Sequence, residues 1–139
     1  MDRLLSASAL ATLAQQAHNA APCACLARDL SAWSAWPVGY REAQFSEVGT
    51  LCRYAAEDAI ISEYHPGGTS YWSAEAPIAP RYYPYNQSTV WACVSCQRLY
   101  LRHNDDGAYH VAPRIRRVQP ELIVDAPHAY DGREAPRAF

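Results

Sequence analysis

The chain contains no lysine, and its twelve basic residues are all arginine. The formal net charge is −2, which argues against nonspecific binding to nucleic acid or membrane surfaces, because such binding needs a clearly basic face. No uninterrupted apolar run reaches the length of about 18 residues that a membrane-spanning helix needs. Polar residues interrupt the stretch from Leu4 to Ala17, so we expect no secretory signal and predict a cytoplasmic protein.

Sequence motifs of common catalytic sites are also missing. The chain has no G-x-S-x-G nucleophile motif, no H-E-x-x-H metalloprotease motif and no phosphate-binding P-loop. Its histidines and carboxylates show no spacing that selects a nucleophile and a base. The sequence therefore predicts a protein that is not an enzyme.

The apolar pattern predicts a single α+β domain, made of an N-terminal helix and a small antiparallel sheet. Leu10, Leu13, Ala14 and Ala17 have helical spacing, which predicts a helix from Asp2 to about Ala17. A length of 139 residues suits one domain. We place the domain at 1–126 and expect a poorly ordered tail at 127–139.

The sheet is predicted mainly from residues 88–112. Thr89–Ala92 reads as a strand, and Arg98–Arg102 alternates polar and apolar side chains. The motif at 104–107 predicts a tight turn, which would place His103 opposite Ala108 at the start of the return strand. Residues 42–56 fit either a helix or a strand, and residues 28–40 are expected to be irregular.

Residues 64–87 form a segment rich in proline, glycine and aromatic side chains. This composition is unlike that of a disordered linker, so we predict a long, ordered loop that either binds a partner or covers the core. The motif His65-Pro66-Gly67-Gly68 predicts a turn in which hydrogen bonds satisfy the histidine.

Four of the five cysteines form two close pairs, Cys23 with Cys25 and Cys93 with Cys96. The second pair follows a predicted strand and predicts a zinc knuckle, a turn that points both sulfur atoms the same way. The first pair must lie in a tight turn, because an extended C-x-C would point its sulfur atoms to opposite faces. Four thiolates would hold structural zinc with no open coordination position.

Two other interpretations of the cysteines stay open. They could be buried free thiols, or Cys93 and Cys96 could be a redox pair, although no thioredoxin-like βαβ pattern surrounds them. Cys52, His103 and His110 could also replace a member of the first pair. Gln97 occupies a position at which a zinc ribbon often has glycine.

Charge is distributed unevenly along the chain. Acidic residues gather before position 76, and arginines dominate residues 81–117. This pattern fits internal salt bridges, an acidic surface that docks on a basic protein, or an arginine-tyrosine surface for nucleic acid. The low overall charge makes direct nucleic-acid binding the weaker of the two functional interpretations.

The stretch from Glu63 to Cys96 carries a set of motifs that resembles a group of small bacterial proteins. The shared residues include Tyr64-His65-Pro66, Gly68, Tyr71-Trp72, Ala76–Pro80, Pro84-Tyr85-Asn86, Trp91 and the C-x-x-C pair. The similarity covers roughly residues 22–125. The group looks like immunity proteins of contact-dependent growth inhibition and related polymorphic-toxin systems. The resemblance implies a cytosolic protein that binds and blocks a cognate toxin, often a nuclease.

The resemblance and the charge pattern together select candidate residues for contact with a partner. The acidic residues that would face a basic toxin are Glu42, Glu47, Glu57, Asp58 and Glu63, and the aromatic anchors are Tyr71, Trp72, Tyr82, Tyr83 and Tyr85. Aromatic side chains supply large, rigid contact areas. The alternative function is a zinc-ribbon nucleic-acid binder that uses Arg98, Arg102, Arg114, Arg116 and Arg117.

Overall fold

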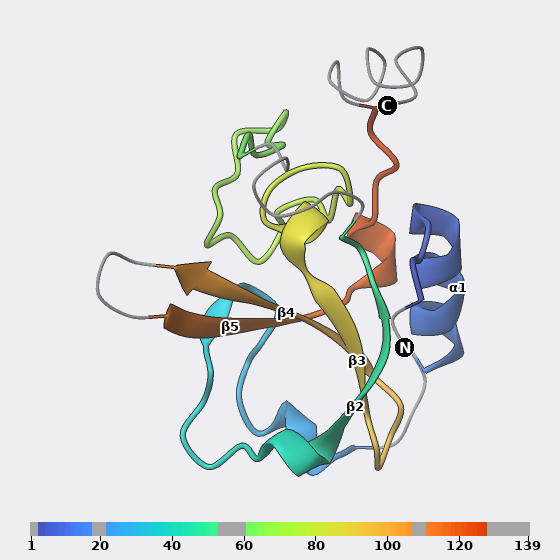
Figure 1. Cartoon of the computed structure of the whole chain (residues 1–139), viewed down its shortest axis with the longest axis vertical. Coiled ribbons are helices and arrows are strands. Elements are labelled where there is room, and N and C mark those ends of the chain that lie inside the picture. The colour runs from blue at the N-terminus through green and yellow to red at the C-terminus, as the bar shows by residue number, and fades with distance from the viewer. Residues whose placement is uncertain (1–2, 18–21, 53–60, 107–110, 128–139) are drawn as a thin grey trace.

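The computed structural model describes residues 3–17, 22–52, 61–106 and 111–127, which form one α-helix and a five-stranded sheet (Figure 1). The helix α1 spans Ala7–Gln16, and the strands are β1 Ser34–Ala35, β2 Phe45–Thr50, β3 Thr89–Cys93, β4 Leu99–Asp106 and β5 Val111–Arg117. The order across the sheet is β1-β5-β4-β3-β2, and all neighbouring strands are antiparallel. The predicted α+β class is confirmed. Within the described ranges no helix has the length and apolar character needed to cross a membrane.

The helix α1 begins later than predicted, because Ser6 caps it. The Ser6 hydroxyl accepts a hydrogen bond from the Ala9 N–H at 3.1 Å, as a serine N-cap typically does. The predicted start at Asp2 is therefore wrong. The predicted apolar stripe is confirmed, since Leu10 and Ala14 are buried.

The chain ahead of α1 lies against the end of β2. The Leu5 N–H donates to the Thr50 carbonyl at 2.9 Å, and the Thr50 N–H donates to the Arg3 carbonyl at 2.7 Å. Gly49 permits this close approach, because a Cβ atom there would lie 2.7 Å from the Arg3 carbonyl oxygen. Within 42–52, the part of the ambiguous segment that the structure describes, a short 3-10 turn at Glu42–Gln44 leads into the strand.

The β4–β5 hairpin differs from the predicted hairpin in register. The predicted turn at 104–107 placed His103 opposite Ala108, but β4 continues to Asp106 and His103 lies opposite Arg114. Residues 107–110, which include the predicted start of the return strand, lie outside the described residues. The observed register places Leu101 opposite Arg116 and Arg102 opposite Ile115, so the fully buried part of β5 lies beside the buried centre of β4.

The sheet buries side chains on both faces. On the first, the helix face, α1 and the aromatic segment pack against Val90, Ala92, Leu99 and Leu101. On the second, the cysteine face, residues of the 23–45 segment pack against Cys93, Tyr100 and Ile115. The strand β1 belongs to this covering segment, and its pairing with β5 was not expected from the sequence.

The aromatic segment is ordered although it has little regular structure. It contains a 3-10 turn at Tyr85–Gln87 and an isolated bridge between Ile78 and Ile123. The His65 ring bonds on both sides, with Nε2 2.6 Å from Glu63 Oε1 and Nδ1 2.8 Å from Thr69 Oγ1. The predicted hydrogen-bonded turn is confirmed.

Arg116 fastens this segment to the sheet. Its side chain is fully buried, and Nη2 donates to the Ala74 and Ala76 carbonyls at 3.1 and 3.0 Å. Nη1 donates to the Tyr85 hydroxyl, and Nε donates to the Ser31 carbonyl at 2.9 Å. A buried cation is costly unless hydrogen bonds satisfy it, so these contacts make Arg116 a structural residue.

Candidate metal centre

The first cysteine pair lies in the tight turn that its spacing requires. Ala24–Leu26 forms a 3-10 turn, closed by hydrogen bonds from the Leu26 N–H to the Cys23 carbonyl and from the Ala27 N–H to the Ala24 carbonyl, both at 3.0 Å. The turn brings both sulfur atoms to the same side. The predicted local geometry of the C-x-C pair is thus confirmed.

The second pair lies at the end of β3 in a knuckle turn. The Cys93 N–H donates to the Arg98 carbonyl at 2.9 Å, and the Gln97 N–H donates to the Cys93 carbonyl at 2.8 Å. Gln97 has a φ of 70°, in the left-handed region that favours glycine. The knuckle therefore forms without glycine at this position.

The four sulfur atoms form one cluster, called here the cysteine cluster: Cys23, Cys25, Cys93 and Cys96. The Cys23 and Cys93 sulfur atoms lie 3.7 Å apart, those of Cys25 and Cys96 lie 3.5 Å apart, and all four lie within 4.8 Å of one another. A regular tetrahedron with metal–sulfur bonds of about 2.3 Å has sulfur–sulfur edges of about 3.8 Å. The thiols are free, and the cluster could hold a metal ion.

The surroundings of the cluster shift the pKa values of its thiols in different directions. Burial raises the pKa of Cys25 well above its usual range, against the hydrogen bond that the Tyr100 hydroxyl donates to its sulfur at 3.0 Å. Burial also raises the pKa of Cys93. Burial acts in the same direction on Cys96, but hydrogen bonds from Arg98 outweigh it and lower the pKa to about 7. A metal that binds thiolates would therefore displace protons.

The other residues considered as ligands lie elsewhere. The Cys52 thiol lies 3.6 Å from the Ser88 carbonyl and is not in the cluster. His103 is on the helix face, where its Nε2 lies 2.7 Å from the Tyr71 hydroxyl. His110 lies outside the described residues. The pair Cys23 and Cys25 thus needs no substitute.

Comparison with protein-family models, curated proteins and solved structures gives no match. The site is therefore interpreted from its own geometry.

The predicted acidic residues that the structure describes are Glu42, Glu47 and Glu63, and they do not lie together on one surface. Glu42 pairs with Arg102, whereas Glu63 pairs with His65. In Figure 1 the turn that contains Glu42 lies at the lower end of the molecule, and the green segment that begins at residue 61 lies at the upper end. Glu47 is exposed on β2, and Glu57 and Asp58 lie outside the described residues.

The predicted aromatic anchors differ in exposure. Trp72 is 56% exposed, whereas Tyr71, Tyr82 and Tyr83 are half-buried. Tyr85 is only 5% exposed, and its hydroxyl accepts hydrogen bonds from the Trp33 indole N–H and from Arg116. Tyr85 is thus part of the core, and its selection as a surface contact is corrected.

A group of aromatic and charged residues on the cysteine face was missed by sequence reasoning. The Arg102 guanidinium carbon lies 4.5 Å from the Trp36 ring centroid and 4.4 Å from the Trp91 ring centroid. The Arg102 side chain also contacts Glu42 at 3.3 Å, and Glu47 lies opposite Trp91 in the sheet. No sequence pattern links these five residues, called here the tryptophan–arginine stack, because strand pairing and the packing of the segment that contains Trp36 and Glu42 bring them together.

Proposed function

We propose that this chain is a non-catalytic binding protein whose cysteine cluster holds one structural zinc ion. The observation that carries the zinc assignment is the packing of four sulfur atoms within 4.8 Å of one another. A tetrahedral site made only of thiolates suits zinc or iron. Zinc with four cysteine ligands has no open position for a substrate, so the ion would stabilise the fold and take no part in a reaction.

The zinc ion would tie the turn at 24–26 to the end of β3. This connection closes the segment of residues 23–45 over the cysteine face, where it packs against Tyr100 and Ile115. Because such a site does not exist in an unfolded chain, metal-binding free energy contributes directly to folding. We expect metal removal to lower the thermal unfolding temperature.

Metal analysis of the purified chain tests this assignment. We expect one zinc per chain, loss of the metal in Cys25→Ser and in Cys93→Ser, and retention in the control Cys52→Ser, because Cys52 lies outside the cluster. Iron in place of zinc would change the assigned metal, and the assignment of the four cysteines as a metal site would stand. A metal-free chain whose mass shows disulfides would contradict the proposal.

We further propose that the partner is a protein toxin, which the chain neutralises in the cytoplasm. The resemblance of the Glu63–Cys96 motifs to immunity proteins supports a toxin. The tryptophan–arginine stack supports protein binding, because tryptophan and arginine are enriched among residues that dominate interface energies. Glu42 and Glu47, two of the predicted acidic contacts, belong to the stack and would meet a basic toxin surface.

Neutralisation of a candidate toxin tests this part. Toxins encoded beside the gene are expressed in cells with and without the chain, and we expect growth to be restored only with it. Trp91→Ala should weaken binding by roughly 30-fold or more, since dominant interface residues contribute about 2 kcal/mol or more. Val111→Ala serves as the comparison, because Val111 is 55% exposed at the start of β5 and lies outside the stack. Full neutralisation by Trp91→Ala would remove the stack from the interface.

Internal contacts of the arginines argue against the nucleic-acid alternative. Arg116 is buried, Arg102 lies between two indole rings, and Arg114 lies 3.2 Å from Asp105. Arginines held in this way are poorly placed to neutralise phosphates. Binding to RNA or DNA with a steep dependence on salt concentration would revive the alternative.

A further inference from the structure

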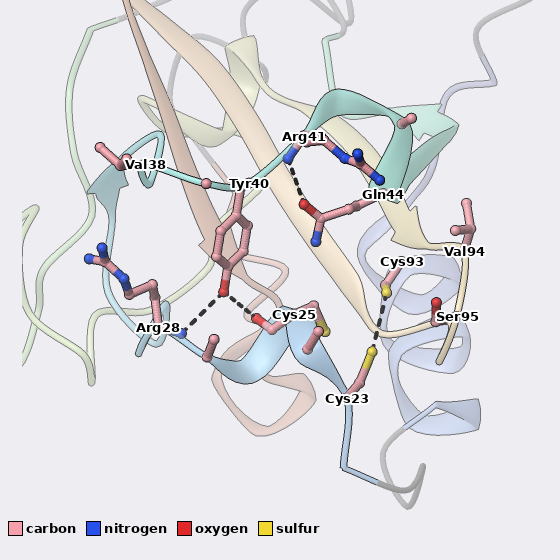
Figure 2. A pocket seen from close by; sticks show the side chains of 14 residues that line it. Cys23, Cys25, Arg28, Val38, Tyr40, Arg41, Gln44, Cys93, Val94 and Ser95 are labelled. Atoms are coloured by element: carbon pink, nitrogen blue, oxygen red, sulfur yellow. Dashed lines mark hydrogen bonds between the residues drawn. The ribbon is translucent and has the colours of Figure 1, made fainter.

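A hollow of about 700 Å³ lies beside the cysteine cluster (Figure 2). Its walls come from three segments: residues 23–25 with 27 and 28, residues 38–41 with 43 and 44, and residues 93–95 of the knuckle turn. Its volume is within the range of roughly 300–1,000 Å³ that is common for binding sites.

Hydrogen bonds tie these walls together. The Tyr40 hydroxyl donates to the Cys25 carbonyl at 2.7 Å and accepts from the Arg28 N–H at 3.1 Å. The Val94 N–H donates to the Gln44 carbonyl at 2.9 Å. These bonds join all three segments and hold the walls of the hollow together without a ligand.

The lining of the hollow has positive side chains and no carboxylate. Its cationic residues are Arg28 and Arg41, which lie on opposite sides of the Tyr40 ring in Figure 2, and Cys23, Cys25 and Cys93 of the cluster also line it. Neither arginine makes an ion pair with a residue that the structure describes. Other arginines do so: Arg81 with Asp125, Arg102 with Glu42, and Arg114 with Asp105. The two arginines of the hollow therefore remain available to a carboxylate from outside.

The negative charge of a metal-loaded cluster does not occupy these arginines. Cys25 accepts a hydrogen bond from the buried Tyr100 hydroxyl, and Cys96 accepts hydrogen bonds from Arg98. Neither Arg28 nor Arg41 hydrogen-bonds to a sulfur atom in the described part of the chain. Such outer hydrogen bonds stabilise the charge of metal-bound thiolates. The donors to the cluster are therefore Tyr100 and Arg98, and not the two arginines of the hollow.

Exposed apolar side chains at the hollow indicate the class of ligand. Val38 is 89% exposed and Val94 is 53% exposed, and both line the hollow. A free inorganic anion would leave these valines in water, whereas a peptide side chain would cover them. We propose that the hollow binds an acidic segment of a partner protein, with carboxylates on Arg28 and Arg41 and apolar side chains against Val38 and Val94, which lie at opposite ends of the hollow in Figure 2. This contact goes beyond the proposed function, because it does not require the partner to be a toxin.

Amide NMR spectra of the zinc-loaded chain test the proposal. The probe is a blocked Glu-Leu-Glu tripeptide, with a blocked Lys-Leu-Lys tripeptide and inorganic phosphate as comparisons. We expect saturable shifts at residues 38–44, 94 and 95 with the acidic peptide only. Changing both Arg28 and Arg41 to glutamine should raise the dissociation constant roughly tenfold or more, since charge-assisted hydrogen bonds are lost. Arg3→Gln is the matched control, because Arg3 is exposed and outside this hollow.

Three results with the peptides would overturn the proposal, and a fourth concerns phosphate. They are equal binding of the basic peptide, unchanged binding in the double glutamine variant, and the absence of saturable shifts with the acidic peptide. Phosphate that binds as tightly as the peptide would show a simple anion site instead of a protein contact. Toxin neutralisation is a separate measurement, so failure of this proposal and failure of the proposed function can be distinguished.

Discussion

Replacing Tyr100 with phenylalanine removes a single hydroxyl group from the wall of the cysteine cluster. This hydroxyl is fully buried and lies 3.0 Å from the Cys25 sulfur and 3.3 Å from the Cys25 carbonyl oxygen. In the zinc-loaded protein it would donate to a thiolate. Hydrogen bonds to charged groups contribute about 1.5–3 kcal/mol, and losing outer-shell partners typically costs about 10–100-fold in metal affinity. We expect Tyr100→Phe to weaken zinc binding within that range.

Tyr40→Phe provides a matched control on the same cysteine. The Tyr40 hydroxyl donates to the Cys25 carbonyl at 2.7 Å, and that contact does not involve the sulfur. Both variants keep the ring and lose one hydroxyl. Only Tyr100→Phe should therefore change the thiolate itself.

Competition with a chelating dye measures the zinc affinity of each variant. Circular dichroism of the zinc-loaded proteins confirms that both are folded. Replacing zinc with cobalt adds a second measurement, because the thiolate-to-cobalt absorption reports the charge on the sulfur ligands. Equal loss of affinity in the two variants would refute the reasoning, since the effect would then come from the turn and not from the thiolate.

The remaining predictions concern the fold and the pH dependence of the site. Arg116→Met should lower the free energy of unfolding by about 3–5 kcal/mol in urea denaturation, because it leaves the Ala74 and Ala76 carbonyls without the donor that Arg116 supplies. A change below about 1 kcal/mol, the usual net value of one hydrogen bond, would contradict its structural role. Gly49→Ala should lower the free energy of unfolding by about 1–3 kcal/mol, because the new Cβ would lie 2.7 Å from the Arg3 carbonyl oxygen. An unchanged melting temperature would show that the N-terminal segment can move away. Zinc affinity should rise with pH around and above neutrality, because zinc displaces protons from thiols whose pKa values are about 7 for Cys96 and higher for Cys25. Competition with the chelating dye across this range measures how steeply the zinc affinity depends on pH. An affinity that does not change with pH would exclude thiol deprotonation as the controlling step.

Local sequence patterns were sufficient to predict the structure wherever neighbouring residues determine it. The helical spacing of Leu10 and Ala14 placed α1, and the C-x-x-C pair after a run of β-forming residues placed the knuckle at the end of β3. The requirement for a tight turn at Cys23 and Cys25 also followed from the backbone alone, since an extended strand points alternate side chains to opposite faces.

Local patterns failed where burial competes with turn propensity. The motif at 104–107 favours a tight turn, yet β4 runs on to Asp106, because the register is decided by which side chains of two strands are buried. Tyr85 shows the same limit, since its aromatic surroundings in the sequence suggested a surface contact and Arg116 holds it in the core instead.

Local sequence patterns predict the class of the fold and show that each cysteine pair must lie in a turn, but they leave Cys52, His103 and His110 open as ligands. Tertiary packing decides that the two cysteine pairs meet, that Arg102 lies against Trp36 and Trp91, and that a hollow with two arginines opens beside the cluster. These arrangements join segments that are distant in the chain. Their positions depend on sheet register and on the packing of both sheet faces, and neither is encoded by the spacing of neighbouring residues.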